Sequence, residues 1–245
     1  MTANQSIEKA TEYHLTEAVI TSDRITTGID IARVINMMKI YEHIEKPYLT
    51  ATFSFADEEN IVQDMDFQGG EKLSIVLVES EETNTGNEIR KDFVIDKIVK
   101  TEKIEERREN VVIHCTEYHM FESTVLNINK SFTGSPTSII KKIIDTNLDK
   151  KVLIDGIDSI KDMKVIIPNM HPIEAVMWLK KRCTTDSGFP FFVYSPLGVD
   201  NIVVRDLDTM LSQTVQNLET PYIYAPSANI SESILKYYTI DSYAY

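Results

Sequence analysis

The sequence predicts a mainly β protein of the α+β class. Segments between Leu15 and about Phe132 are mostly strand-like, with apolar residues at alternate positions. The period changes near residue 133, where helical spacing first appears. The chain has 245 residues, of which 42% are hydrophobic and 26% charged. These values are typical of a soluble globular protein with one large domain or two modest ones.

The first part of the chain is expected to supply most of the strands. Its clearest strand is Tyr48–Phe55, in which apolar residues alternate along one face. These are Leu49, Ala51, Phe53 and Phe55. The acidic stretch Ala56–Met65 favours a short helix, because carboxylates are stabilised near the positive end of a helix dipole. Further strands are predicted at residues 17–21, 29–36, 72–78, 93–99 and 111–115, the last two joined by a charged loop, Thr101–Asn110.

Helical patterns follow after residue 133. Ser135 is a suitable N-cap and Pro136 suits the first helical position, so a helix is expected from there to Asn147. A second helix is predicted from Pro172, because apolar residues recur on one helical face. They are Pro172, Ala175, Val176, Leu179 and Cys183. A two-stranded hairpin over residues 191–205 is expected to follow this helix.

Composition excludes several classes of function. The formal net charge of −13 opposes binding to nucleic acid phosphates and to anionic membrane surfaces. Cys115 and Cys183 are too few for a disulfide framework, and both fall on apolar faces, so buried free thiols are expected. No run reaches the ~20 apolar residues that span a bilayer. The start of the sequence lacks a signal-peptide pattern, so we expect the protein to start as a soluble cytoplasmic one.

No constellation of reactive residues is found in the sequence. His114, Cys115 and His119 invite a metal interpretation, but in an extended strand the two histidines would point to opposite faces. The chain has no G-x-S-x-G motif, no P-loop and no G-x-G-x-x-G motif. We therefore assign no catalytic, cofactor-binding or metal-binding residue and no cofactor, and we expect that the protein is not an enzyme.

The order of the predicted elements resembles a known family. A strand, an acidic short helix, a Gly69-Gly70 turn, a strand, a strand pair and the Pro136 helix follow one another as in the first part of the central baseplate hub protein of contractile-tailed bacteriophages. The helix and hairpin of residues 172–211 also resemble that family's second domain, in which a helix carrying a Trp precedes a strand rich in Phe and Tyr. The matching residues are Trp178, Phe191, Phe192 and Tyr194.

The resemblance implies two tube-like antiparallel β-barrel domains with short helices packed on them. We expect a loosely ordered segment at residues 1–13, a first domain at 14–132, a second at 133–220, and return strands toward the first domain at 221–245. Members of this family are homotrimers, and three chains of two domains make a pseudo-sixfold ring. That ring joins the tail tube to the central spike, and DNA passes through it during genome ejection.

The resemblance also implies partners and a location. The expected partners are two further copies of the chain, the tail tube or tube-adaptor protein, the central spike protein and the baseplate wedge proteins, with no membrane binding. The expected location is the tail baseplate of the virion. Two alternatives remain: the hub of another contractile injection or secretion system, such as a type VI secretion spike, and an enzyme such as a tail-associated cell-wall hydrolase.

The acidic stretch from Phe55 to Thr83 supports a further hypothesis. It holds nine acids and one base, Lys72. An acidic lining would keep DNA from binding to the bore. We expect some of the acids between Asp57 and Glu82 to face either that bore or a subunit interface, although an outer, solvated position explains them equally well.

Overall fold

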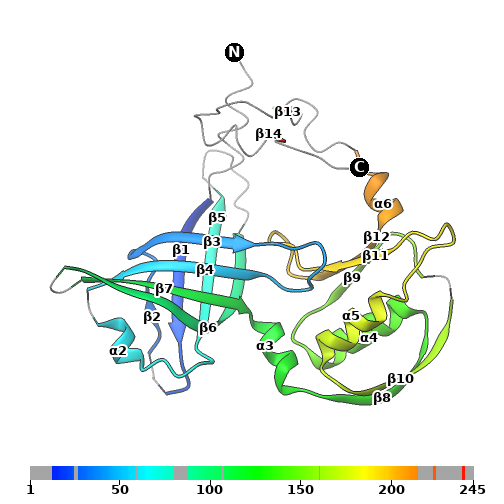
Figure 1. The fold of residues 1–245 in the computed structure, drawn as a ribbon, viewed down its shortest axis with the longest axis horizontal. Helices are drawn as coiled ribbons and strands as arrows, with labels where there is room; N and C mark the ends of the chain where they lie inside the picture. Colours follow the sequence, from blue (N-terminus) through cyan, green and yellow to red (C-terminus); the bar gives the residue numbers. More distant parts are fainter. Residues whose placement is uncertain are drawn as a thin grey trace.

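The computed structural model describes residues 13–24, 27–58, 60–79, 88–105, 108–159, 161–214, 223–224 and 239–240. It is mainly β with several short helices, which confirms the predicted α+β class. Two hydrophobic cores are present. One lies inside a curled seven-stranded sheet built from the first part of the chain, and the other lies among the small sheets and helices that follow (Figure 1).

The first half is one antiparallel sheet with the order β2-β1-β5-β6-β7-β4-β3. Its strands are β1 (Tyr13–Thr21), β2 (Ile29–Asp30), β3 (Ile35–Tyr41), β4 (Thr50–Asp57), β5 (Lys72–Glu79), β6 (Glu88–Glu105) and β7 (Arg108–Glu117). The predicted apolar face of β4 is confirmed, because Leu49, Ala51, Phe53 and Phe55 are all fully buried. The ring of Phe53 also meets that of Phe93 edge to face, with centroids 6.0 Å apart.

The two ends of this sheet approach each other through a short turn. The N–H of Ile31 donates to the carbonyl of Ala18 in β1, and the N–H of Ala56 in β4 donates to the carbonyl of Val34. The predicted strand over residues 29–36 is therefore interrupted, because a turn at residues 31–34 separates β2 from β3.

The second half, from α3 to α6, contains two small sheets and four helices among the described residues. Its elements are α3 (Tyr118–Val125), β8 (Ile128–Gly134), α4 (Pro136–Asn147), β9 (Val152–Asp155), β10 (Met163–Met170), α5 (Pro172–Lys180), β11 (Phe191–Tyr194), β12 (Ile202–Asp206) and α6 (Leu207–Leu211). β8 pairs with β10, and β11, β12 and β9 form a three-stranded sheet. The pairing of β9 with β12 is parallel, which corrects the expectation of purely antiparallel strands.

The two predicted helices are confirmed. The side chain of Ser135 caps α4 by accepting from the N–H of Ser138, and α4 ends at Asn147 as expected. Helix α5 begins at Pro172 and buries Ala175 and Leu179, among others. The hairpin β11–β12 is also present. The short acidic helix is α2 (Ile61–Met65), and Asp57 accepts hydrogen bonds from the N–H groups of its first two residues.

One predicted loop is instead a β-ribbon. Residues 101–105 continue β6 and residues 108–110 begin β7, so the expected loop Thr101–Asn110 is mostly paired strand. Residues 101–103 of β6 are all exposed, so this segment lacks the alternation that identifies a half-buried strand. In Figure 1 the ribbon extends away from the second half of the molecule.

The closed barrels and the domain boundaries stay predictions. β8, expected at the end of the first domain, contributes Ile128 and Phe132 to the second core. Apart from Tyr13, which begins β1, the segment 1–13 lies outside the described residues. Within residues 221–245 the structure describes β13 (Ile223–Tyr224) and β14 (Thr239–Ile240), which pair in parallel with each other.

Candidate functional site: a buried charged cluster between the two halves

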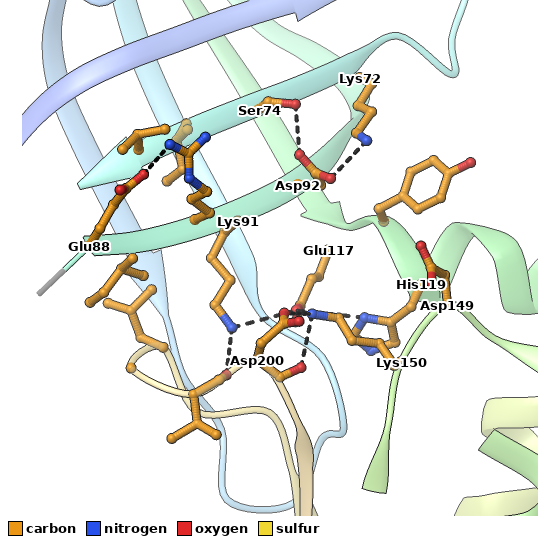
Figure 2. A pocket seen from close by; sticks show the side chains of 18 of the residues that line it. Lys72, Ser74, Glu88, Lys91, Asp92, Glu117, His119, Asp149, Lys150 and Asp200 are labelled. Atoms are coloured by element: carbon orange, nitrogen blue, oxygen red, sulfur yellow. Dashed lines mark hydrogen bonds and ion pairs between the residues drawn. The ribbon is translucent and has the colours of Figure 1, made fainter. Parts of the chain in front are cut away.

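A cluster of charged side chains is buried where the two halves meet. We define the interdomain cluster as Lys91, Glu117, His119, Lys150 and Asp200. These residues come from β6, the end of β7, the start of α3, the loop after α4 and the β11–β12 loop. Figure 2 shows their side chains pointing toward one another. They line a cavity of about 680 Å³ together with residues of β5, β6 and the β11–β12 loop.

Glu117 lies at the centre of the cluster, with its side chain 1% exposed. Its Oε2 accepts from the backbone N–H of Leu49 and from the hydroxyl of Ser195, both at 2.9 Å. Its Oε1 lies 3.3 Å from the Nζ of Lys150 and 3.9 Å from the Nζ of Lys91. Because Leu49 belongs to the first half and Ser195 to the second, one carboxylate joins the two.

Two lysines complete the connection across the interface. The ammonium group of Lys91, which extends from the sheet of the first half, donates to the carbonyls of Pro196 at 3.1 Å and Val199 at 2.8 Å. Lys150 reaches Glu117 across the interface and donates to the carboxylate of Asp200 within the second half at 2.5 Å. Lys91 thus holds the β11–β12 loop through backbone atoms, which fixes the path of that loop against the first sheet.

His119 extends the cluster toward the loop before β4. Its Nε2 lies 2.6 Å from the carbonyl of Pro47, and because a carbonyl oxygen can only accept, Nε2 carries a proton. The other ring nitrogen, Nδ1, is 3.6 Å from Oε1 of Glu117, and within the described residues neither atom has a hydrogen-bond partner. Sequence reasoning placed His119 on a strand, but it lies in α3, a helix that links the halves.

Burial and charge oppose each other in this cluster. Burial alone would raise the pKa of Glu117, but the nearby charges of His119, Lys150 and Lys91 and the N–H of Leu49 lower it below its ordinary value. Burial lowers the pKa of His119 and that of Lys91. Burial also acts to lower the pKa of Lys150, yet the bond to Asp200 and the charge of Glu117 raise it overall.

The arrangement is suited to holding two bodies in one orientation. Breaking a buried ion pair by removing one partner costs about 3–5 kcal/mol, because the other charge stays buried without compensation. Apolar contacts reinforce the cluster: Tyr48 of the first half packs against the second core, and Leu197 of the β11–β12 loop packs against the first. The site therefore fixes the angle between the two halves.

The residues that the sequence analysis considered for chemistry serve the two cores, the sheet surface and the interdomain cluster. Cys115 and Cys183 are buried free thiols, one in each core, as predicted. The Nδ1 of His114 lies 3.3 Å from the carboxylate of Asp96 on the sheet surface. Within the described part of the chain, no group of three or more His, Cys, Asp or Glu side chains could hold a metal ion. None of the described helices is long and apolar enough to cross a membrane.

Two of the nine acids proposed for a bore or an interface serve the fold instead. Asp57 is 7% exposed and caps α2. Glu71 is 1% exposed, pairs with Arg24 and accepts from the N–H groups of Gln68 and Gly69. These two acids cannot face a bore. Glu58, Asp64 and Asp66 are exposed, and the side chains of Glu59, Glu79, Glu81 and Glu82 lie outside the described residues.

Sequence reasoning missed the interdomain cluster. Its five members lie in four separate stretches of the chain between residues 91 and 200, and each looks like an ordinary surface charge. The one available signal was Glu117, which ends an apolar strand and sits two residues before a histidine.

Comparison with solved structures identifies proteins with a similar fold. No protein-family model and no curated protein matches this chain. The 43 kDa tail protein of prophage MuSo2 from Shewanella oneidensis superposes with a TM-score of 0.53 at 10% identity, covering 87% of this chain and 57% of its own. Prophage tail protein gp18 from Listeria monocytogenes gives a TM-score of 0.46 at 10% identity, and the match covers 78% of this chain and 50% of the Listeria chain. The Francisella PdpA–VgrG complex gives a TM-score of 0.44 at 8% identity, and the match covers 88% of this chain and 32% of the matched chain.

The conclusion on fold rests on the Shewanella protein, whose TM-score exceeds 0.5. The likeness extends over 87% of the present chain, so it includes both halves and not one sheet alone. The chain spans 57% of the length of that protein. This chain therefore shares the fold of a prophage tail protein.

Proposed function

We propose that this protein is a structural component of a contractile phage tail, the central baseplate hub. The observation that supports it is the fold shared with the Shewanella prophage tail protein over 87% of the chain, together with the order of elements that resembles the hub family. In this proposal three copies form a ring of pseudo-sixfold symmetry. The ring joins the tail tube to the central spike and allows DNA to pass during ejection.

The interdomain cluster supports the same proposal on physical grounds. A pseudo-sixfold ring made of three chains requires the two halves of each chain to act as neighbouring wall segments at one fixed angle. The buried contacts of Lys91 and Glu117 restrict that angle more strictly than apolar contact does, because hydrogen bonds are directional. The proposal also makes the protein a non-enzymatic one, located in the baseplate and bound to tube, spike and wedge proteins.

Two measurements test this function. Native mass spectrometry of the purified chain at increasing concentration should give a species of three times the 28.0 kDa subunit mass. Images of purified tail particles carrying a label on this chain should place the label on the tail axis at the baseplate. A monomer at every concentration, or a label on the capsid or fibres, would refute the hub role. A monomer that degrades peptidoglycan would favour the tail-associated hydrolase.

A further inference from the structure

The loop between β3 and β4 lies across the junction of the two halves. We call residues Glu42–Leu49 the strap, because they belong to the first half and contact the second half along their length. Near the start of the strap, Oε2 of Glu42 accepts from the N–H of Leu197 at 3.2 Å. Further on, the carboxylate of Glu45 lies 3.7 Å from the Nζ of Lys180 in α5. The first part of the strap is therefore bound to two elements of the second half.

The second part of the strap is more deeply placed in the junction. The carbonyl of Pro47 accepts from Nε2 of His119 at 2.6 Å, and Tyr48 packs against the second core. The backbone N–H of Leu49 donates to Glu117 at 2.9 Å. Pro47 and Leu49 are buried, whereas residues 42–46 are exposed. The strap thus helps to enclose His119, whose side chain is 1% exposed.

The surroundings of His119 are unfavourable for a charged imidazole. A neutral imidazole has one ring proton, which Nε2 uses to bind the strap, so a second proton would reside on Nδ1. That atom faces Oε1 of Glu117 at 3.6 Å. The same carboxylate oxygen already lies 3.3 Å from the Nζ of Lys150 and 3.9 Å from the Nζ of Lys91 (Figure 2). A protonated His119 would be a third cation around one buried carboxylate, and an uncompensated buried charge is costly.

The other charged groups of the junction do not offset that third cation. Every element packed there contributes charges, and these are Lys91 of β6, Glu117 of β7, Asp149 and Lys150 after α4, Lys180 of α5, Asp200 of the β11–β12 loop, and Glu42 and Glu45 of the strap. The side chain of Asp200 is 84% exposed, and Glu42, Glu45 and Asp149 are exposed as well, so water screens their charges. Among these groups, Glu117 is the one buried carboxylate beside His119.

We propose that the strap is an acid-released latch, in which a second proton on His119 favours separation of the strap from the second half. In the closed junction, burial is the main cause that lowers the pKa of His119, and the charge of Glu117 offsets this only in part. In the open junction water reaches the imidazole, so its pKa returns toward 6.5. The ratio of open to closed chains should therefore rise as the pH falls below 6.5, by up to about tenfold per pH unit. This inference goes beyond the proposed function and does not depend on it, because it concerns the junction within one chain.

Hydrogen exchange of the unaltered chain at pH 6.5 and 5.5 gives the first test. The amides of Leu49 and Leu197, corrected for intrinsic exchange rates, report on the junction, and that of the buried sheet residue Ile113 reports on unfolding of the first half. Because a local opening exposes only the junction, its two amides should be at least about tenfold less protected than Ile113. Their protection should also fall by about three- to tenfold over this pH step. Protection equal to that of Ile113, or unchanged between the two pH values, would refute the latch.

A matched pair of histidine variants gives the second test. His119→Gln keeps a side-chain N–H that can donate to Pro47 but takes up no second proton, so the protection of Leu197 should change less than about twofold between the two pH values. The control is His43→Gln, which alters the exposed part of the same strap and should keep the fall of about three- to tenfold. An equal fall in both variants, or no fall in either, would refute a latch at His119. The first test needs no substitution, so it decides the question even where circular dichroism shows that His119→Gln does not fold.

Discussion

Replacing the central carboxylate of the interdomain cluster is the strongest test of its role. Glu117→Gln keeps the shape of the side chain and an oxygen that can accept from Leu49 and Ser195, but it removes the negative charge. Lys150 keeps Asp200 as a partner, whereas Lys91 keeps only two backbone carbonyls. Since removing one partner of a buried ion pair costs about 3–5 kcal/mol, we expect the free energy of unfolding to fall by that amount.

Denaturant unfolding at pH 7 measures this loss and also shows how the halves are coupled. Trp178, the single tryptophan, lies in α5 and reports on the second half by fluorescence, while far-ultraviolet circular dichroism reports on both. In the unaltered protein the two transitions should coincide, and in Glu117→Gln they should separate. The control is Glu102→Gln, whose partner Lys100 is 58% exposed, with an expected change below about 1 kcal/mol. A loss in Glu117→Gln no larger than in this control would refute the argument.

Three further predictions concern single residues. Burial lowers the pKa of His119 in the folded chain, so the unfolded chain takes up a proton first as the pH falls below 6.5. The free energy of unfolding should therefore fall below that pH. His119→Gln should flatten this pH dependence when unfolding is measured at a series of pH values. Burial raises the pKa of Cys115, and that of Cys183 to about 12, so neither thiol should react with a disulfide reagent at pH 8 until the chain is unfolded. Gly156 has φ +115°, and an added Cβ would overlap Asp206 and Thr209. Gly156→Ala should therefore destabilise the protein by at least about 1–3 kcal/mol, as measured by thermal unfolding. Gly198→Ala is the control and should leave the stability unchanged, because the space around Gly198 is open.

The elements that the sequence predicted correctly are those whose local signals agree with their burial. Ser135 and Pro136 mark the start of α4, and the isoleucines that follow point into the second core. The strand β4 has alternating residues because one of its faces is the inside of the sheet. In both elements a buried surface imposes the period that sequence reading detects.

The elements that it missed lack such a surface or depend on distant residues. The part of β6 that was expected to be a loop has no buried residue over 101–103, so its strand character leaves no alternation in the sequence. The parallel pairing of β9 with β12 brings together segments about 50 residues apart, and nothing local specifies it. The cluster around Glu117 depends on the docking of two halves, which pattern analysis of one segment at a time does not detect.

The use of charge at this interface follows from what each kind of contact can specify. Apolar burial is non-directional, so an apolar junction would resist separation of the halves while tolerating a change in their angle. Lys91 binds two carbonyls of one loop, and Glu117 binds a backbone N–H of one half and a hydroxyl of the other, which defines a single arrangement. Buried charges are a poor way to gain stability alone. Their presence here is explained if the angle between the halves matters more than the strength of the junction, as the proposed ring requires of a chain that would supply two of its wall segments.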